Sequence, residues 1–465
     1  MSITSKRLAI LVGGGPAPGI NSVIGAATIR AALEGVEVVG IMDGFKWIMH
    51  GDINHIKELT IDKVSRIHFS GGSYLGTARD NPTKKKETLD HVVTSLVRLN
   101  VDKLITIGGD DTAYSAMKVE ERAAGRIRVV HVPKTIDNDL DLPHGTPTFG
   151  YQTARHVGVE IVKNLMVDAQ TTSRWYFVIS MGRKAGHLAL GIGKAAGATL
   201  TIIPEEFPEG HIPLSQIVDI LVGSIIKRLS YGRSDGVAIL AEGLAERLNP
   251  EELHALKHAE RDDFGHIRLA EISFGDVVKK QVQKRLKEFG IKITIVSKDI
   301  GYELRCADPI PFDMEYTRDL GYTAAQFILE GGNAAMVSIQ NGHFVPLYFK
   351  DILDPVTKKT RVRMVDITSE YYFIARRYML RLNKTDFEDT FELSKYAATA
   401  GISVEAFRKQ FEYLIERDLL YQFLERQRIR VTGKESNLAH KPRELRDKNR
   451  REATTPETEV VKPGK

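Results

Sequence analysis

The sequence predicts an α/β fold with two Rossmann-like parallel-sheet domains, an active site between them and a helical C-terminal extension. Three observations support this prediction. Short runs rich in Val, Ile and Leu alternate with segments of helical periodicity, which favours parallel sheets covered on both faces. Polar and glycine-rich loops follow the ends of several of these runs, where ligands bind in such sheets. From residue 366 to about 426 the pattern is helical throughout.

Composition narrows the class of protein further. A chain of 465 residues with 42% hydrophobic content is long enough for two or three domains. Its single cysteine, Cys306, excludes an internal disulfide and favours a reducing compartment. No apolar run approaches the length of a membrane span, so we expect a cytoplasmic protein without a membrane partner. Residues 433–465 are expected to form a basic, disordered tail; such a tail could contact nucleic acid, but no nucleic-acid partner is expected.

The first element is a predicted strand at residues 8–12, followed by a glycine-rich loop at 13–21 and a helix through about Leu33. Such a loop lets backbone N–H groups approach a phosphate. It lacks the Gly-Lys-Ser/Thr of a Walker A loop, and Pro18 stands where a dinucleotide fingerprint needs its last glycine. A tight strand-to-helix turn is the alternative interpretation. After a strand at 36–41, a second glycine-rich loop presents Arg79 either to an anion or to solvent.

Two strand-then-loop units in succession form the centre of the chain. The first is a strand at 104–107 followed by Gly108-Gly109-Asp110-Asp111, and the second is a strand at 127–132 followed by the loop 133–139. The second loop contains Lys134, Asp137 and Asp139. Phosphoryl transfer requires this combination: carboxylates for Mg²⁺, a cation for the phosphates and a base for the attacking hydroxyl. Each loop alone could instead be a turn with a helix cap.

The second half repeats the alternation. A helix is expected from about 150 to 170, and a charged segment at 251–263 reads as a surface helix or an insertion. The other expected elements are strands at 175–180, 199–203, 236–240 and 291–296, helices at 215–228, 276–289 and 313–329, and a hairpin of 337–339 with 345–347 around Asn341-Gly342.

Four polar residues follow expected strand ends in this half. Arg183 and Arg305 could hold a phosphate through paired N–H donors. Glu242 could accept hydrogen bonds from sugar hydroxyls, and Tyr302 could donate one to the phosphate. Singly, each has a structural alternative, such as a surface ion pair or a charge at a helix N-terminus. Together they favour a phosphorylated sugar as ligand.

The two central loops, together with these later stretches, resemble the phosphofructokinase family, specifically its pyrophosphate-dependent members. The resemblance covers residues from about 8 to 340 and implies reversible transfer from pyrophosphate to the 1-hydroxyl of fructose 6-phosphate, in glycolysis or gluconeogenesis. It implies that Gly14, Arg79 and Lys134 bind pyrophosphate, that Asp110 holds Mg²⁺ and that Asp137 is the base. It also implies a sugar-phosphate site made of Thr135, Ile136, Asp137, Asp139, Arg174, Met181, Gly182, Arg183, Glu242, Tyr302, Glu303, Leu304 and Arg305.

The same resemblance implies the domain organisation and the assembly. Residues 1–147 and 306–355 would form the donor and Mg²⁺ domain, 148–305 the sugar-phosphate domain and 356–432 the helical region. Arg174 matches an arginine that crosses from a neighbouring subunit in family members, so a homodimer or homotetramer is expected. Lys298 is a candidate for a further basic residue of the site.

Asp111 and Lys134 are expected to decide the phosphate donor, and we count both as catalytic with Asp137. ATP-using relatives commonly carry glycine at the place of Asp111, where a carboxylate would fill space and repel the α-phosphate. An ATP-dependent enzyme is the alternative. A dinucleotide-dependent dehydrogenase and an inactive regulatory subunit of the same fold are further alternatives, disfavoured by the imperfect fingerprint and by the intact polar set.

Overall fold

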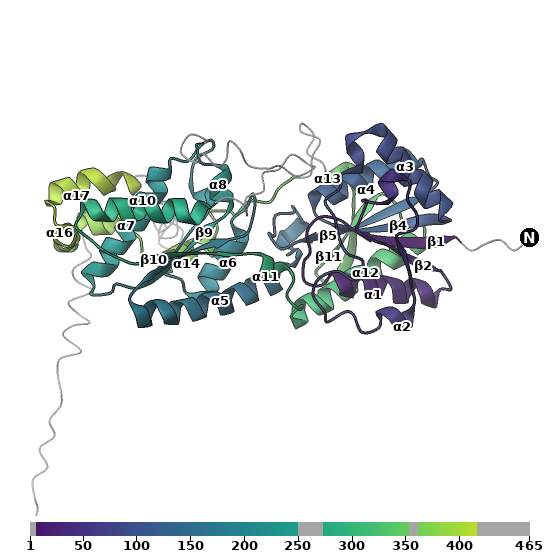
Figure 1. Ribbon diagram of the computed structural model, residues 1–465, viewed down its shortest axis with the longest axis horizontal. Helices are drawn as coiled ribbons and strands as arrows, with labels where there is room; N and C mark the ends of the chain where they lie inside the picture. Colours follow the sequence, from purple (N-terminus) through teal and green to yellow (C-terminus); the bar gives the residue numbers. More distant parts are fainter. Residues whose placement is uncertain (1–5, 250–272, 353–360, 416–465) are drawn as a thin grey trace, which may run out of the picture. The chain divides into compact units, whose positions relative to one another are not determined.

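The computed structural model describes residues 6–249, 273–352 and 361–415. The expected charged segment at 251–263, the end of the helical region and the tail at 433–465 lie outside these residues. Among the described helices, none combines the length and the apolar character that crossing a lipid bilayer requires. Within the described part, the chain forms two β-sheets with helices on both faces of each, so the predicted fold class is confirmed (Figure 1).

The first sheet has eight strands in the order β12-β11-β5-β4-β1-β2-β3, with β6 beside β5. Its centre is parallel, and the edge strands β3 and β12 run antiparallel to their neighbours. Its strands are β1 (Arg7–Val12), β2 (Val38–Ile41), β3 (Ile56–Leu59), β4 (Val101–Gly108), β5 (Arg128–Thr135), β6 (Phe149–Gly150), β11 (Ala335–Gln340) and β12 (His343–Tyr348). The predicted hairpin is confirmed: Asn341 and Gly342 join β11 to β12 with φ of 51° and 79°, the left-handed pair that a two-residue hairpin turn requires.

Helices cover both faces of this sheet. Helices α1 and α12 pack together on one face, and α3 and α4 pack on the other (Figure 1). The bounds are α1 (Ile20–Leu33), α2 (Ile61–Val64), α3 (Lys86–Arg98), α4 (Asp110–Ala123), α12 (Pro311–Leu329) and α13 (Phe349–Ile352). Pro311 begins α12, where its fixed φ suits the first turn and its missing N–H costs nothing.

The second sheet is wholly parallel, in the order β10-β7-β9-β8. Helices α5 and α6 lie on one face and α7 and α10 on the other. The elements are α5 (Tyr151–Thr172), β7 (Trp175–Ser180), α6 (His187–Ala196), β8 (Leu200–Ile202), α7 (Leu214–Ser230), β9 (Gly236–Ala241), α8 (Gly243–Glu246), α10 (Phe274–Glu288), β10 (Ile295–Ile300) and α11 (Tyr302–Arg305).

The C-terminal helices join the core of the second sheet. They are α14 (Glu370–Tyr378), α15 (Lys384–Glu388), α16 (Thr390–Thr399) and α17 (Val404–Phe411). Tyr396, Phe407 and Phe411 are fully buried against α7 and α10. Burying three aromatic side chains stabilises this docking by several kcal/mol, on the order of 2 kcal/mol for each ring. The domain boundaries drawn from the sequence stay a prediction.

Three expected elements differ from those observed. The strand expected at 291–296 is β10, which begins only at Ile295; Ile291 and Ile293 lie before it and pack against the core. Residues 302–305, expected as a loop, form the one-turn helix α11. Strand β5 continues to Thr135 through Pro133 and Lys134, because the parallel ladder with β6 extends it at Lys134 and Thr135.

Candidate active site

The glycine-rich loop after β1 is shaped by close approaches that only glycine permits. A Cβ on Gly13 would lie 2.5 Å from Thr112 Oγ1, and Gly14 has φ of +80°. Thr77 donates a hydrogen bond of 2.5 Å to Gly14 O, and Gly13 forms a bridge with Ala78. The loop before Arg79 is thereby fixed beside the loop after β1. The two glycine-rich loops singled out from the sequence form one surface.

Three cationic side chains converge on this surface. Lys134 Nζ donates a hydrogen bond to Gly15 O, and a Cβ on Gly14 would lie 3.4 Å from the same Nζ. A Cβ on Gly15 would lie 3.1 Å from Arg305 Nη1 and 3.7 Å from Arg79 Nη2. Burial, with the two guanidinium groups, lowers the pKa of Lys134 to about 8. A cluster of positive charge beside backbone N–H groups is suited to a compact, highly charged anion.

Arg305 lies close to the loop assigned to the donor. The sequence grouped Arg305 with the sugar-phosphate residues, and the structure brings its guanidinium beside the glycine-rich loop, so that it lies within reach of both expected phosphate sites. The guanidinium also stacks over the ring of Tyr302, 4.6 Å from its centroid, and Tyr302 is 57% exposed. Glu303 accepts a hydrogen bond of 3.1 Å from Gly301 N, and Leu304 is buried.

The ends of β4 and β5 carry the predicted carboxylates. Asp110 and Asp111 form the first turn of α4, where the helix dipole favours negative charge, and Asp110 Oδ1 accepts a 2.9 Å hydrogen bond from Asp111 N. In the next loop, Thr135 Oγ1 accepts from Asp137 N at 3.0 Å and donates to Asp139 Oδ1 at 3.1 Å. One threonine hydroxyl therefore orients the backbone of one carboxylate residue and the side chain of the other.

The loops of the second sheet complete this arrangement. Arg183 N donates to Asp137 Oδ2 at 3.4 Å, and Gly182 N donates to Glu242 Oε2 at 3.3 Å. Burial raises the pKa of Glu242 to about 7. Met181 N pairs with Ile300 O, so the residue that follows β7 is held against the end of β10. The strand ends of both sheets thus place polar groups around Asp137.

The carboxylates influence one another electrostatically. Burial, opposed by the backbone N–H and the charge of Arg183, raises the pKa of Asp137. Burial and the charges of Asp137 and Asp110 raise the pKa of Asp139 to about 7. A divalent cation would relieve this repulsion. The described residues contain no group of three or more acidic, His or Cys side chains arranged around one metal position.

Two expected residues lie outside the strand-end loops, and one residue of these loops was missed. Arg174 precedes β7, whereas Met181 follows it, so the six-residue strand separates them by about 20 Å; Arg174 Nε instead lies 3.9 Å from Asp168. Lys298 lies within β10, before the strand end. Lys184 was not predicted, yet its Nζ is 3.6 Å from Asp110 Oδ2. Its position directly after Arg183, in a strand-end loop, was the available sequence signal.

Comparison with known proteins gives consistent matches. Residues 7–328 match the phosphofructokinase family. A pyrophosphate--fructose 6-phosphate 1-phosphotransferase from Thermotoga maritima is 54% identical over 417 residues, covering 89% of this chain and 99% of that relative. A protein of the same name from Naegleria fowleri is 53% identical over 421 residues, covering 88% and 96%.

A solved structure agrees with the fold. The pyrophosphate-dependent phosphofructokinase from Nitrosospira multiformis has a TM-score of 0.60 at 17% identity, covering 86% of this chain and 93% of that one. The family match extends over most of the chain and includes the loops after β1, β4, β5, β7 and β9 that form the site. The resemblance noted from the motifs is confirmed, and the chain belongs to the phosphofructokinase family.

Proposed function

We propose that this protein transfers a phosphoryl group from pyrophosphate to the 1-hydroxyl of fructose 6-phosphate, reversibly, giving fructose 1,6-bisphosphate and phosphate. Relatives named for this reaction align with nearly their whole length. The observation that carries the proposal is the position of Asp137. Its half-buried carboxylate accepts from Arg183 N of the second sheet, while Lys134, at the end of β5, reaches the glycine-rich surface. A base thus lies between a cation cluster and the polar strand-end loops of the second sheet.

The proposed chemistry follows from these groups. Asp137 takes the proton from the sugar hydroxyl, whose oxygen then attacks the terminal phosphorus as the bond to the departing phosphate breaks. Burial raises the pKa of Asp137, which makes it a better proton acceptor than an exposed carboxylate. Lys134, Arg79 and Gly14 bind the donor. Asp110 would hold Mg²⁺, which when bound would neutralise charge on the donor oxygens.

The donor preference is proposed to depend on Asp111 and Lys134. Asp111 adds negative charge to the first turn of α4, beside Thr112, which contacts Gly13. An α-phosphate there would meet a like charge at a few ångströms in a partly desolvated place, at a cost of several kcal/mol. Lys134 supplies a compact charge for pyrophosphate. This pair supports pyrophosphate over ATP.

The sugar phosphate is proposed to bind among the loops after β5, β7, β9 and β10. Glu242 would accept from sugar hydroxyls. The remaining proposed contacts are Thr135, Ile136, Asp139, Met181, Gly182, Arg183, Tyr302, Glu303, Leu304 and Arg305. Arg174, at the opposite end of β7, is proposed to complete the site of a neighbouring subunit in a homodimer or homotetramer. We also propose a cytoplasmic location, supported by the single, unpaired Cys306.

A coupled assay with the purified full-length chain tests the function. Fructose 1,6-bisphosphate formation is followed with pyrophosphate or ATP as donor, with Mg²⁺ or with a chelator. We expect turnover with pyrophosphate and Mg²⁺, little with ATP and none after chelation. Turnover with ATP alone would refute the donor, and no turnover with either, in a folded chain, would favour the inactive subunit.

A further inference from the structure

A short segment from the C-terminal region lies against the loop after β5, which contains the proposed base Asp137. Residues 361–365, which we name the strap, lie beyond the part of the chain that matches the family. Val362 forms an antiparallel bridge with Leu140, and Arg363 N donates a 2.7 Å hydrogen bond to Asp139 O. The strap therefore pairs, through its backbone, with the residues that directly follow Asp137.

The side chain of Arg363 holds the same loop through its guanidinium. Nε and Nη2 donate to Asn138 O at 3.1 and 3.0 Å, Nη2 donates to Asn138 Oδ1 at 2.5 Å, and Nη1 donates to Thr146 O at 2.9 Å. Asn138 has φ of 56°, a left-handed conformation that asparagine adopts more readily than other non-glycine residues, and its Oδ1 also accepts a 3.0 Å hydrogen bond from Thr148 N. The rigid fork of an arginine is suited to this multiple contact, which a lysine could not reproduce.

The other side of the strap is attached to the second sheet. His187, the first residue of α6, places Nε2 3.1 Å from Arg363 O, and burial lowers the pKa of His187 to about 4, so the neutral ring donates this bond. Val365 N and Gly186 N both donate to Glu205 Oε1 at 2.9 Å. The strap thus links the loop after β5 to the loop after β7, which contains Arg183.

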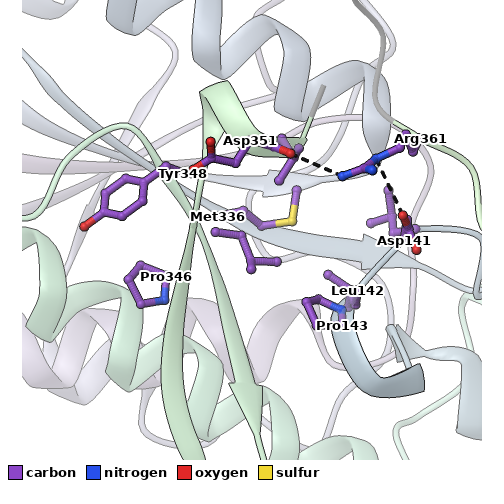
Figure 2. Close-up of a pocket in the computed structure, with 11 residues that line it drawn as sticks. Asp141, Leu142, Pro143, Met336, Pro346, Tyr348, Asp351 and Arg361 are labelled. Carbon is purple, nitrogen blue, oxygen red and sulfur yellow. Dashed lines mark hydrogen bonds and ion pairs between the residues drawn. The ribbon is translucent and has the colours of Figure 1, made fainter. Parts of the chain in front are cut away.

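Figure 2 shows the neighbouring Arg361, which serves as a comparison. Arg361 lines a pocket of about 160 Å³ together with apolar side chains such as Met336. Its Nε is 3.7 Å from Asp141 Oδ2, and both side chains are about half exposed. An exposed ion pair of this kind contributes little. Arg361 therefore shares the segment and the charge of Arg363 without touching Asn138.

We propose that Arg363 is a positioning residue for phosphoryl transfer. Together with Thr148 N, it holds Asn138 in its left-handed conformation, and the backbone on either side then sets the directions of the Asp137 and Asp139 carboxylates. The inference rests on the proposed function, because it assigns a purpose to the loop only if Asp137 is the base. It also gives the C-terminal region a part in the reaction: the strap holds a turn that lies 225 positions earlier in the chain.

The test compares four single variants of the full-length enzyme: Arg363→Ala, Arg363→Lys, Arg361→Ala and Asp137→Asn. For Arg363→Ala we expect kcat to fall about 10- to 100-fold, since small misplacements of a reacting group have effects of that order. The KM values for both substrates should change less than about twofold, because no binding residue is removed. Added guanidinium ion should restore part of kcat, Arg363→Lys should be intermediate, and Arg361→Ala should match the parent.

Three results would overturn the inference. The first is an Arg363→Ala variant with the kcat of the parent. The second is an equal loss of kcat in Arg361→Ala. The third is a loss of kcat in Arg363→Ala that guanidinium ion does not rescue and that accompanies a lower thermal midpoint, which would make Arg363 merely structural. Asp137→Asn separates this failure from failure of the proposed function. If it is inactive while Arg363→Ala is fully active, only the inference fails; if it keeps the kcat of the parent, the proposed base is wrong.

Discussion

Lys134→Met should make the protein more stable and less active at the same time. Lys134 is 5% exposed at the end of β5, and methionine preserves most of its apolar stem. Burial and the neighbouring arginines lower the pKa of Lys134 from 10.5 to about 8, which corresponds to about 3 kcal/mol of unfavourable interaction of the charged form. Methionine cannot donate the hydrogen bond to Gly15 O, and this loss offsets about 1 kcal/mol of the stability that is gained by removing the buried charge.

The sign of the pH dependence follows from the direction of the shift. The folded-state pKa of Lys134 lies below that of an exposed lysine, so the charged side chain destabilises the fold, fully below about pH 8. This cost disappears as pH rises from about 8 toward 10.5. The variant should therefore gain about 2 kcal/mol in free energy of unfolding at pH 7, and the gain should shrink at higher pH.

The activity should change in the opposite direction. A unit charge about 4 Å from a donor phosphate contributes about 4 kcal/mol at an effective dielectric constant of about 20. Removing it should lower kcat/KM for pyrophosphate about 10³-fold. The parent enzyme should also lose kcat/KM as pH rises through about 8, when Lys134 is deprotonated.

Denaturant unfolding and steady-state kinetics measure the two effects separately. Lys118→Met is a matched control, because Lys118 pairs with Glu121 on the surface of α4, and it should change both quantities little. A Lys134→Met variant that is destabilised at pH 7 and retains kcat/KM for pyrophosphate would refute the reasoning on both counts.

Three other changes test separate parts of the site. Asp111→Gly should raise kcat/KM for ATP by at least about tenfold, because a like charge near the α-phosphate is removed; paired assays with both donors measure this, and an unchanged donor ratio would contradict it. Asp137→Asn should lower kcat about 10²- to 10⁴-fold with little change in KM, as for loss of a general base; single-turnover kinetics check that the chemical step is affected. Glu242→Gln should weaken fructose 6-phosphate binding and flatten its pH dependence below about pH 7, where the Glu242 carboxylate of the parent takes up a proton and loses an acceptor; an unaltered KM profile would remove Glu242 from the sugar site.

Most of the fold was predictable because it depends on local patterns. Buried parallel strands read as β-branched runs, and glycines at 13 and 14 mark a close turn whatever surrounds them. The carboxyl ends of neighbouring parallel strands share an edge, so Asp110 and Asp137 could be grouped from their strands alone. The start of β10 was misjudged because Ile291 and Ile293 pack against the core without belonging to the strand, and an apolar run does not reveal whether its residues pair in a sheet.

The amino-acid sequence by itself determined the two sheets, the loops that carry the polar groups and the family. Only the tertiary structure shows that Arg305 lies beside the glycine-rich loop, that Lys184 pairs with Asp110 and that Arg363 donates hydrogen bonds to Asn138. The physical reason is that these contacts join segments far apart in the chain, whereas the backbone periodicities that reveal helices and strands extend over a few residues. A side chain that acts at long range leaves no periodic pattern around itself.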